Sequence, residues 1–171
     1  MAVMDSVNEA LSIGFDSRAV ANRILTKASA KGRSLTIMQL VKLIYFSQGW
    51  YLAFTDKPLT YHPAQAWQYG PVYPHVYKAF PKAGSSLLDG LILDKSTGKP
   101  YEMAASEDED HMIDWVLAEY GTAHAFDLSR MTHVDDGPWK QTIDATGPYS
   151  EIPNSLLKAY FKRFIRQDEP T

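Results

Sequence analysis

The sequence predicts a mainly α-helical (α+β) fold, a single compact globular helical domain of about five or six helices with a small antiparallel β hairpin or sheet. Two capping boxes, which begin at Thr36 and Ser106, each introduce a run whose apolar residues recur every three or four positions. The length of 171 residues and the apolar fraction of 45% suffice for one hydrophobic core. We expect one domain over residues 16–167, between an N-terminal tail, 1–15, and a C-terminal tail, 168–171.

Composition and charge argue against several classes of protein. The 17 basic residues are outnumbered by 20 acidic ones, and the net charge of −3 gives no global attraction to nucleic acid. The absence of cysteine excludes disulfides, thiolate metal sites and cysteine catalysis. No apolar run approaches the roughly 20 residues that span a bilayer, and Asp5 and Glu9 stand where a signal peptide is basic. We therefore expect a cytoplasmic protein without a membrane partner.

The first helix is expected over residues 18–32. Asp16 or Ser17 can cap its start, because either side chain can accept a hydrogen bond from a free backbone N–H group of the first turn. Apolar residues recur every four positions from Val20, and Gly32 suits the left-handed conformation that often follows a helix.

The second helix is expected to start after Thr36 and to continue to about Phe54. The Thr36 hydroxyl and the Gln39 amide can satisfy each other's backbone N–H groups. The apolar stripe that follows is too broad for a helix with one solvated face, so we expect this helix in the centre of the core. The core positions that we expect in it are Leu40, Leu43 and Ile44.

The segment after this helix is harder to assign. Residues 64–69 fit either a short strand or an extended chain, and Gly70-Pro71 is expected to interrupt any regular element. A proline then opens a short helix over residues 74–80, with Tyr77 among its inward side chains.

A β hairpin is expected farther along the chain. Residues 87–93 and 99–103 read as two short strands, and residues 94–98 provide the turn between them.

Two helices are expected between residues 106 and 131. The second capping box opens the first of them, over residues 106–120. The second, over residues 123–131, would bury Met131 and either Ala125 or Phe126.

The last helix is expected to begin at Pro153, after a turn over residues 135–138. Its apolar side chains form a continuous stripe that includes Phe161 and Phe164.

Three motifs carry a family resemblance. They are Lys42-Leu43-Ile44-Tyr45, then Ala66-Trp67-Gln68-Tyr69-Gly70-Pro71-Val72, and late in the chain Thr132-His133 followed by Pro138-Trp139. In this order and combination they resemble the Panacea domain, the family of SocA-like antitoxins and phage-associated proteins. The resemblance covers roughly residues 17–165.

The resemblance implies an antitoxin of a toxin–antitoxin system. Its partner would be a cognate protein toxin, which it neutralises by direct protein–protein binding. An alternative that the resemblance also implies is a proteolytic adaptor, as in members of the SocA type that deliver the toxin to an ATP-dependent protease. No cofactor is implied.

Catalytic and metal-binding readings are weak. His133 with Asp135 and Asp136 could ligate a metal, but the spacing of zinc motifs is absent, so a capping or hydrogen-bonding histidine is favoured. Ser47 and Ser129 lie in helical segments without the turn that exposes a serine nucleophile. We therefore predict no enzyme, no catalytic residue, no metal site and no cofactor.

Two charged runs have structural and functional readings. The acidic run at residues 107–110 could grip a basic toxin or mimic nucleic acid, but helix capping explains it more simply. Lys158, Lys162, Arg163 and Arg166 could bind phosphates, which is the nucleic-acid-binding alternative for the C-terminal helix face. A solvated face that complements the helix dipole is the favoured reading of these cations.

The aromatic residues of the second motif are the candidates for partner binding. Tyrosine and tryptophan are favoured at interfaces because they offer large contact area and a polar group. We expect Trp67 and Tyr77 to be structural core residues. The predicted partner-binding residues are Tyr69, Tyr73 and Trp139, the rigid turn Gly70-Pro71 that presents them, and Lys42 and Gln48 of the long helix.

Overall fold

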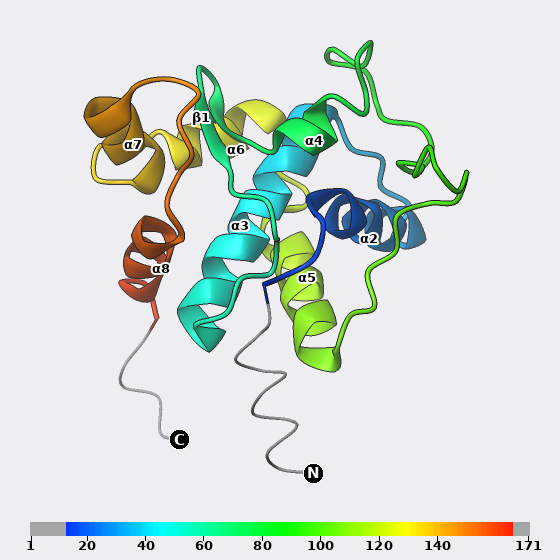
Figure 1. Cartoon of the computed structure of the whole chain (residues 1–171), viewed down its shortest axis with the longest axis horizontal. Helices are drawn as coiled ribbons and strands as arrows, with labels where there is room; N and C mark the ends of the chain where they lie inside the picture. The colour runs from blue at the N-terminus through cyan, green and yellow to red at the C-terminus, as the bar shows by residue number, and fades with distance from the viewer. Residues whose placement is uncertain (1–12, 166–171) are drawn as a thin grey trace.

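Helix α3 (Ile37–Thr55) forms the centre of a computed structural model that describes residues 13–165. Figure 1 shows the other helices around it and a small hairpin of β1 (Gln65–Trp67) and β2 (Gly70–Val72) at one end. The mainly helical prediction is confirmed. The other helices of the described residues are α2 (Ser17–Ala30), α4 (Pro74–Tyr77), α5 (Glu107–Tyr120), α6 (Ala125–Thr132), α7 (Pro138–Thr146) and α8 (Asn154–Lys162).

Capping explains where α3 begins and ends. Gln39 N donates to Thr36 Oγ1 at 3.2 Å, and Thr36 N donates to Gln39 Oε1 at 2.8 Å, so the predicted capping box is confirmed. The helix ends at Asp56, which takes the left-handed conformation with φ of 61°.

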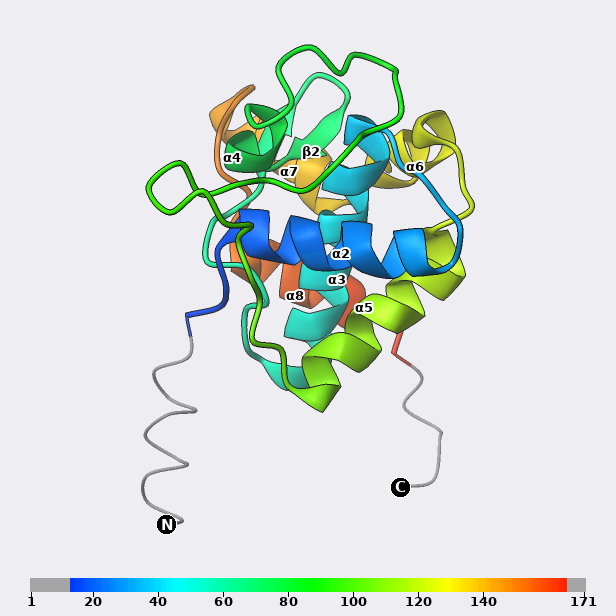
Figure 2. The ribbon, with the colours of Figure 1, turned by 90° about the vertical axis from the view of Figure 1, so that its right-hand side faces the viewer.

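The broad apolar face of α3 is buried by helices on several sides. α2, α5 and α8 all pack against it, and Figure 2 shows α2 on one side of α3 and α8 on the other. Gly49 permits the close approach of α8, because a Cβ atom at that position would overlap the Phe161 ring of that helix. Leu40, Leu43 and Ile44 are fully buried, as predicted.

The strands agree with the sequence prediction only in part. β1 falls within residues 64–69, where a short strand was one of two alternatives, whereas β2 begins at Gly70-Pro71, which was expected to interrupt any regular element. β1 and β2 pair antiparallel with Trp67 opposite Gly70, while the expected hairpin at residues 87–93 and 99–103 is reduced to one bridge between Leu93 and Pro100. Gly70 allows the tight connection because it adopts φ of 110°, which other residues avoid. Pro71 lacks an N–H group, but β2 is an edge strand and tolerates it.

The residues before α8 extend this sheet on the other side of β1. Ala66 N donates to Ser150 O at 2.9 Å, and Ile152 N donates to Ala64 O at 2.8 Å. The hairpin is therefore tied to the C-terminal part of the chain through its backbone.

Helix α7 was not predicted. Gly137 and Pro138 were expected in a turn, but Pro138 occupies the first position of this helix, where its missing N–H group costs nothing. Helix α4 is shorter than expected and leaves Tyr77 exposed, so its assignment to the core was wrong.

Several side chains that were expected to point inward are exposed. They are Phe54, Met131 and Phe164. Of the two alternatives for the start of α6, Phe126 is exposed and Ala125 is half-buried. The helical period identifies an apolar face, but it does not say whether another element covers that face.

A long connection between α4 and α5 runs alongside α2 (Figure 2) and is fixed by Asn22. The buried Asn22 amide accepts from Ile92 N at 2.8 Å, and it donates to Ile92 O at 2.9 Å and to Tyr101 O at 3.0 Å. Asn22 thus ties to α2 a segment in which only part of the expected strand pairing remains, the Leu93–Pro100 bridge with the hydrogen bonds from Asp94 N to Lys99 O and from Tyr101 N to Ile92 O.

None of the helices in residues 13–165 combines the length and the apolar character that crossing a membrane requires.

Candidate partner-binding surface

The three sequence motifs meet at the β1–β2 hairpin. Trp139 Nε1 of α7 donates to Trp67 O at 2.7 Å, and Ser129 Oγ of α6 donates to Tyr69 O at 2.6 Å. A third carbonyl, Pro71 O, accepts from Lys42 Nζ of α3 at 3.0 Å. Side chains from three helices therefore satisfy carbonyl groups at the turn. We call this set, together with His133, the carbonyl clamp: Lys42, Ser129, His133 and Trp139.

His133 connects the turn to α6. Its Nδ1 atom lies 2.6 Å from Ser129 O, and its Nε2 atom lies 3.2 Å from Gln68 O. The ring packs on Trp139 with centroids 4.1 Å apart. His133 thus forms hydrogen bonds, which was the favoured reading, and no group of three or more potential ligands in residues 13–165 could hold a metal ion.

Lys42 is buried rather than exposed. Its side chain has 0% exposure and forms no ion pair within residues 13–165, and burial lowers its pKa from 10.5 to about 7. The amine lies beneath Gly70, where an added Cβ atom would come within 2.8 Å of Lys42 Cε and 2.6 Å of Thr132 Oγ1. The expectation that Lys42 faces a partner is therefore wrong, and its role is to hold the hairpin from below.

Gln48 is also a buried structural residue. Its Oε1 atom accepts from Leu59 N at 2.7 Å and from Thr60 N at 2.9 Å, and its Nε2 atom donates to Asn154 Oδ1 at 3.1 Å. Gln48 thereby joins α3 to the chain that follows it and to the start of α8. Its expected place on the surface is wrong for the same reason as that of Lys42.

The aromatic candidates divide between core and surface. Tyr73 is completely buried, which corrects its assignment to the interface, and burial raises the pKa of its phenol. Trp67 is half-buried, and its ring contacts Tyr77 at a centroid distance of 5.1 Å. Tyr69 is 63% exposed at the tip of the hairpin, and Trp139 is half-buried beside it. Gly70 and Pro71 are buried and position the tip without being exposed themselves.

A second feature was missed by the sequence analysis. An apolar groove of about 330 Å³ opens beside the hairpin, over the side of α3 that faces α5 and α8. We call it the aromatic groove. Its lining residues are Tyr45, Phe46, Trp50, Tyr120, Met131, Thr132, Val134, Pro138, Tyr160, Phe161 and Phe164.

The apolar surface continues past this groove toward the end of α3. Trp50 and Trp115 meet edge to face with centroids 5.4 Å apart. Beyond them a second hollow is lined by Phe54, Met112 and Trp115, and by Asp108. The signal for this surface was present in the breadth of the α3 stripe, but that breadth was attributed to burial.

The C-terminal basic residues are engaged in ion pairs. Lys158 Nζ lies 2.8 Å and Lys162 Nζ 3.2 Å from Asp56 Oδ1, and Arg163 lies 2.7 Å from Asp136 Oδ2. These pairs leave less free positive charge for phosphates than the sequence indicated. Arg166 lies outside the described residues.

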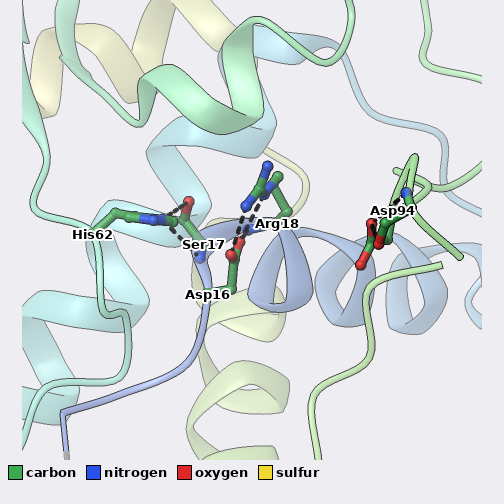
Figure 3. Close-up of polar contacts among 6 residues, drawn as sticks. Asp16, Ser17, Arg18, His62 and Asp94 are labelled. Atoms are coloured by element: carbon green, nitrogen blue, oxygen red, sulfur yellow. Dashed lines mark hydrogen bonds and ion pairs between the residues drawn. The ribbon is translucent and has the colours of Figure 1, made fainter.

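The start of α2 holds a cluster of polar residues (Figure 3). Asp16 caps the helix by accepting from Arg18 N at 2.9 Å, and the Arg18 guanidinium binds the same carboxylate at 2.9 and 2.8 Å. Ser17 Oγ lies 2.7 Å from His62 Nδ1, and the His62 ring stacks on His75 at 3.9 Å. Burial and the neighbouring His75 lower the pKa of His62. This cluster fastens α2 to the chain that leaves α3.

The helical fold and the meeting of the three motifs at one hairpin define the class of protein. The chain belongs to the family described as Antitoxin SocA-like, Panacea domain, which it matches over residues 40–140. The sequence is 34% identical over 141 residues to the protein named Antitoxin SocA of Caulobacter vibrioides (strain NA1000 / CB15N), a match that covers 80% of this chain and 74% of that protein. No solved structure matches the chain significantly. Membership of this family indicates an antitoxin role, and an antitoxin implies a toxin as partner.

Proposed function

We propose that this protein neutralises a cognate toxin by binding it directly. The observation that carries the proposal is family membership over residues 40–140, together with a relative that is named as an antitoxin. The toxin is held and masked, without being delivered to a protease.

The exposed aromatic side chains support direct binding. Tyr69 lies exposed at the hairpin tip, where its carbonyl is bound by Ser129 of α6. The aromatic groove is lined by Thr132 at the end of the same helix and by Val134 of the α6–α7 connection. Protein interfaces are enriched in aromatic residues, and a standard interface buries roughly 1,600 Å² in total. The hairpin tip and the groove together offer such residues on a surface that the clamp keeps in place.

Co-expression with the gene encoded beside it tests the proposal. We expect that neighbouring gene to arrest growth when expressed alone, growth to recover when this protein is present, and the two proteins to co-purify. A harmless neighbour, or two proteins that never co-purify, would overturn the proposal.

The lifetime of the toxin separates masking from degradation. In a chase experiment we expect the toxin to persist with an unchanged half-life while growth is protected. If the half-life shortens when this protein is present together with an ATP-dependent protease, the masking mechanism is wrong and an adaptor mechanism replaces it.

A further inference from the structure

The aromatic groove has helices on three sides. Its floor is formed by Tyr45, Phe46 and Trp50 of α3, and Figure 1 shows α8 and α5 on either side of this helix. Both α5 and α8 pack on α3, but they do not pack extensively on each other. The aromatic groove lies between them, with Tyr120 on the α5 side and Tyr160 on the α8 side.

Large apolar side chains remain exposed along this space. Phe54 is 58% exposed, Phe164 54% and Trp115 41%. Contiguous apolar surface of this kind marks interaction sites, because its burial removes it from water. Phe54 lies near the end of α3 and Phe164 follows α8, so the exposed surface extends beyond a single pocket.

The two rims of the groove differ in charge. On the α8 side Lys158, Lys162 and Arg163 are all paired with carboxylates. On the α5 side Asp108 lines the second hollow, which continues the apolar surface past the groove, and Glu119 lies one turn after Trp115 on the same helix face. Neither carboxylate belongs to an ion pair that the structure gives for residues 13–165. The α5 rim therefore keeps unneutralised negative charge.

We propose that the groove receives an amphipathic α-helix of the toxin, whose edge toward α5 carries lysine or arginine. This inference rests on the proposed function and names the element of the partner that is bound. A helix can place apolar side chains from successive turns on the exposed aromatic residues, and helices pack at about 8–10 Å between axes. The basic edge complements Asp108 and Glu119.

An extended segment fits the groove less well. The floor and both walls are helices, whose backbone N–H and C=O groups are paired within each helix. A strand would find no backbone partners along them and would leave its own polar groups unpaired. The chemistry of the walls thus favours an occupant that satisfies its backbone internally.

Photo-crosslinking in the co-expressed complex tests the occupant. Phe54 and Phe164 are each replaced by the photoreactive residue p-benzoylphenylalanine in the full chain, and Leu93, which is 53% exposed in the α4–α5 connection, serves as the matched control. We expect positions 54 and 164 to crosslink to one helical segment of the toxin that contains lysine or arginine, and position 93 to give no crosslink. Crosslinks between two copies of this chain, or to a non-helical or acidic segment of the toxin, would overturn the inference.

Charge reversal gives an independent measurement. Asp108→Lys and Glu119→Lys are expected to weaken toxin binding about ten-fold or more and to reduce its dependence on salt. Asp89→Lys changes an exposed carboxylate that lies outside both hollows and should leave the dissociation constant within about two-fold. Circular dichroism and thermal unfolding confirm that each variant is folded.

The outcomes separate the two proposals. If toxin binding is unchanged by both charge reversals, the inference that the groove receives a basic helix is overturned, while neutralisation by direct contact remains intact. A wild-type protein that does not bind the toxin would overturn the proposed function and the groove with it.

Discussion

Lys42 places an amine in the core beneath the hairpin, where it donates a hydrogen bond to the carbonyl oxygen of Pro71. Burial lowers the pKa of this amine from 10.5 to about 7. At a pH between these two pKa values, the Lys42 amine is protonated in the unfolded chain but not in the folded protein. The contribution of Lys42 to stability therefore rises with pH. Below pH 7 both states are protonated, and the full cost of burying the charge applies.

We therefore predict a pH-dependent difference between wild type and Lys42→Met. Relative to wild type, the free energy of unfolding of the variant should decrease by about 1.4 kcal/mol per pH unit between pH 7 and 9, and stay constant below pH 7. Urea unfolding at several pH values measures it. Lys31→Met, at an exposed lysine, should show no such slope. A difference that is flat across this range would show that the amine stays charged when buried.

Gly70 and Gly98 separate two effects of a side chain at positive φ. At Gly70, with φ of 110°, a Cβ atom would also meet Thr132 Oγ1 and Lys42 Cε, whereas at Gly98, with φ of 72°, nothing lies within 4 Å. We expect Gly70→Ala to lower the free energy of unfolding by about 3 kcal/mol or more and Gly98→Ala by about 1 kcal/mol. Equal losses in denaturant titrations would mean that the close approach of Lys42 is unimportant.

At the scale of the elements, capping was the most reliable sequence signal. The boxes at Thr36 and Ser106 mark the starts of α3 and α5 because the hydrogen bonds that define them are local. Gly137-Pro138 fits a turn or a first helical turn equally well. Helix α7 also makes a contact with a distant part of the chain, the hydrogen bond from Trp139 to Trp67 O. A local sequence pattern cannot reveal such a contact.

The candidate site was predicted only in part. Lys42, the segment around Gly70 and the pair His133 and Trp139 come together in the structure, a meeting that the sequence analysis did not predict. Their roles differ from the expectation, because Lys42 faces inward and contributes to the scaffold. Whether a side chain of α3 faces the core or the solvent depends on which helices pack over that side of α3. The sequence shows the apolar period of the helix, but it does not show which elements cover each face.

The α4–α5 connection allows a test at this scale. Asn22→Asp keeps the shape of the side chain but replaces the amide that donates to Ile92 O and Tyr101 O. We expect a loss of about 2–3 kcal/mol in the free energy of unfolding, since a buried carboxylate would then face two carbonyl oxygens. Hydrogen exchange at Ile92 N should become faster than in wild type. Protection that persists there would mean that the connection is held by other contacts.

At the scale of the whole molecule, stability and partner binding are expected to separate at the hairpin tip. Tyr69 is 63% exposed, and the clamp binds its backbone carbonyl and not its ring. Tyr69→Ala should change the free energy of unfolding by less than about 0.5 kcal/mol while weakening toxin affinity by about 1–2 kcal/mol.

Tyr61→Ala is the matched control, because Tyr61 is 58% exposed and lies outside the hairpin. It should alter neither the thermal midpoint nor the affinity measured by calorimetry. If Tyr69→Ala destabilises the free protein as much as it weakens the complex, the tip belongs to the fold and not to the interface.

The carbonyl clamp also sets an order of events during synthesis of the chain. Its donors lie from 29 to 72 residues away from the carbonyls they bind, and three of the four follow the hairpin in the sequence. A ribosome that has released residues 65–72 has not yet made α6 or α7. Tyr69 can then be present, but of the clamp only Lys42 is available to hold the hairpin, and the donors from α6 and α7 are missing until translation is nearly complete. We expect that a prematurely terminated chain does not protect the cell, even when it retains every exposed residue of the tip.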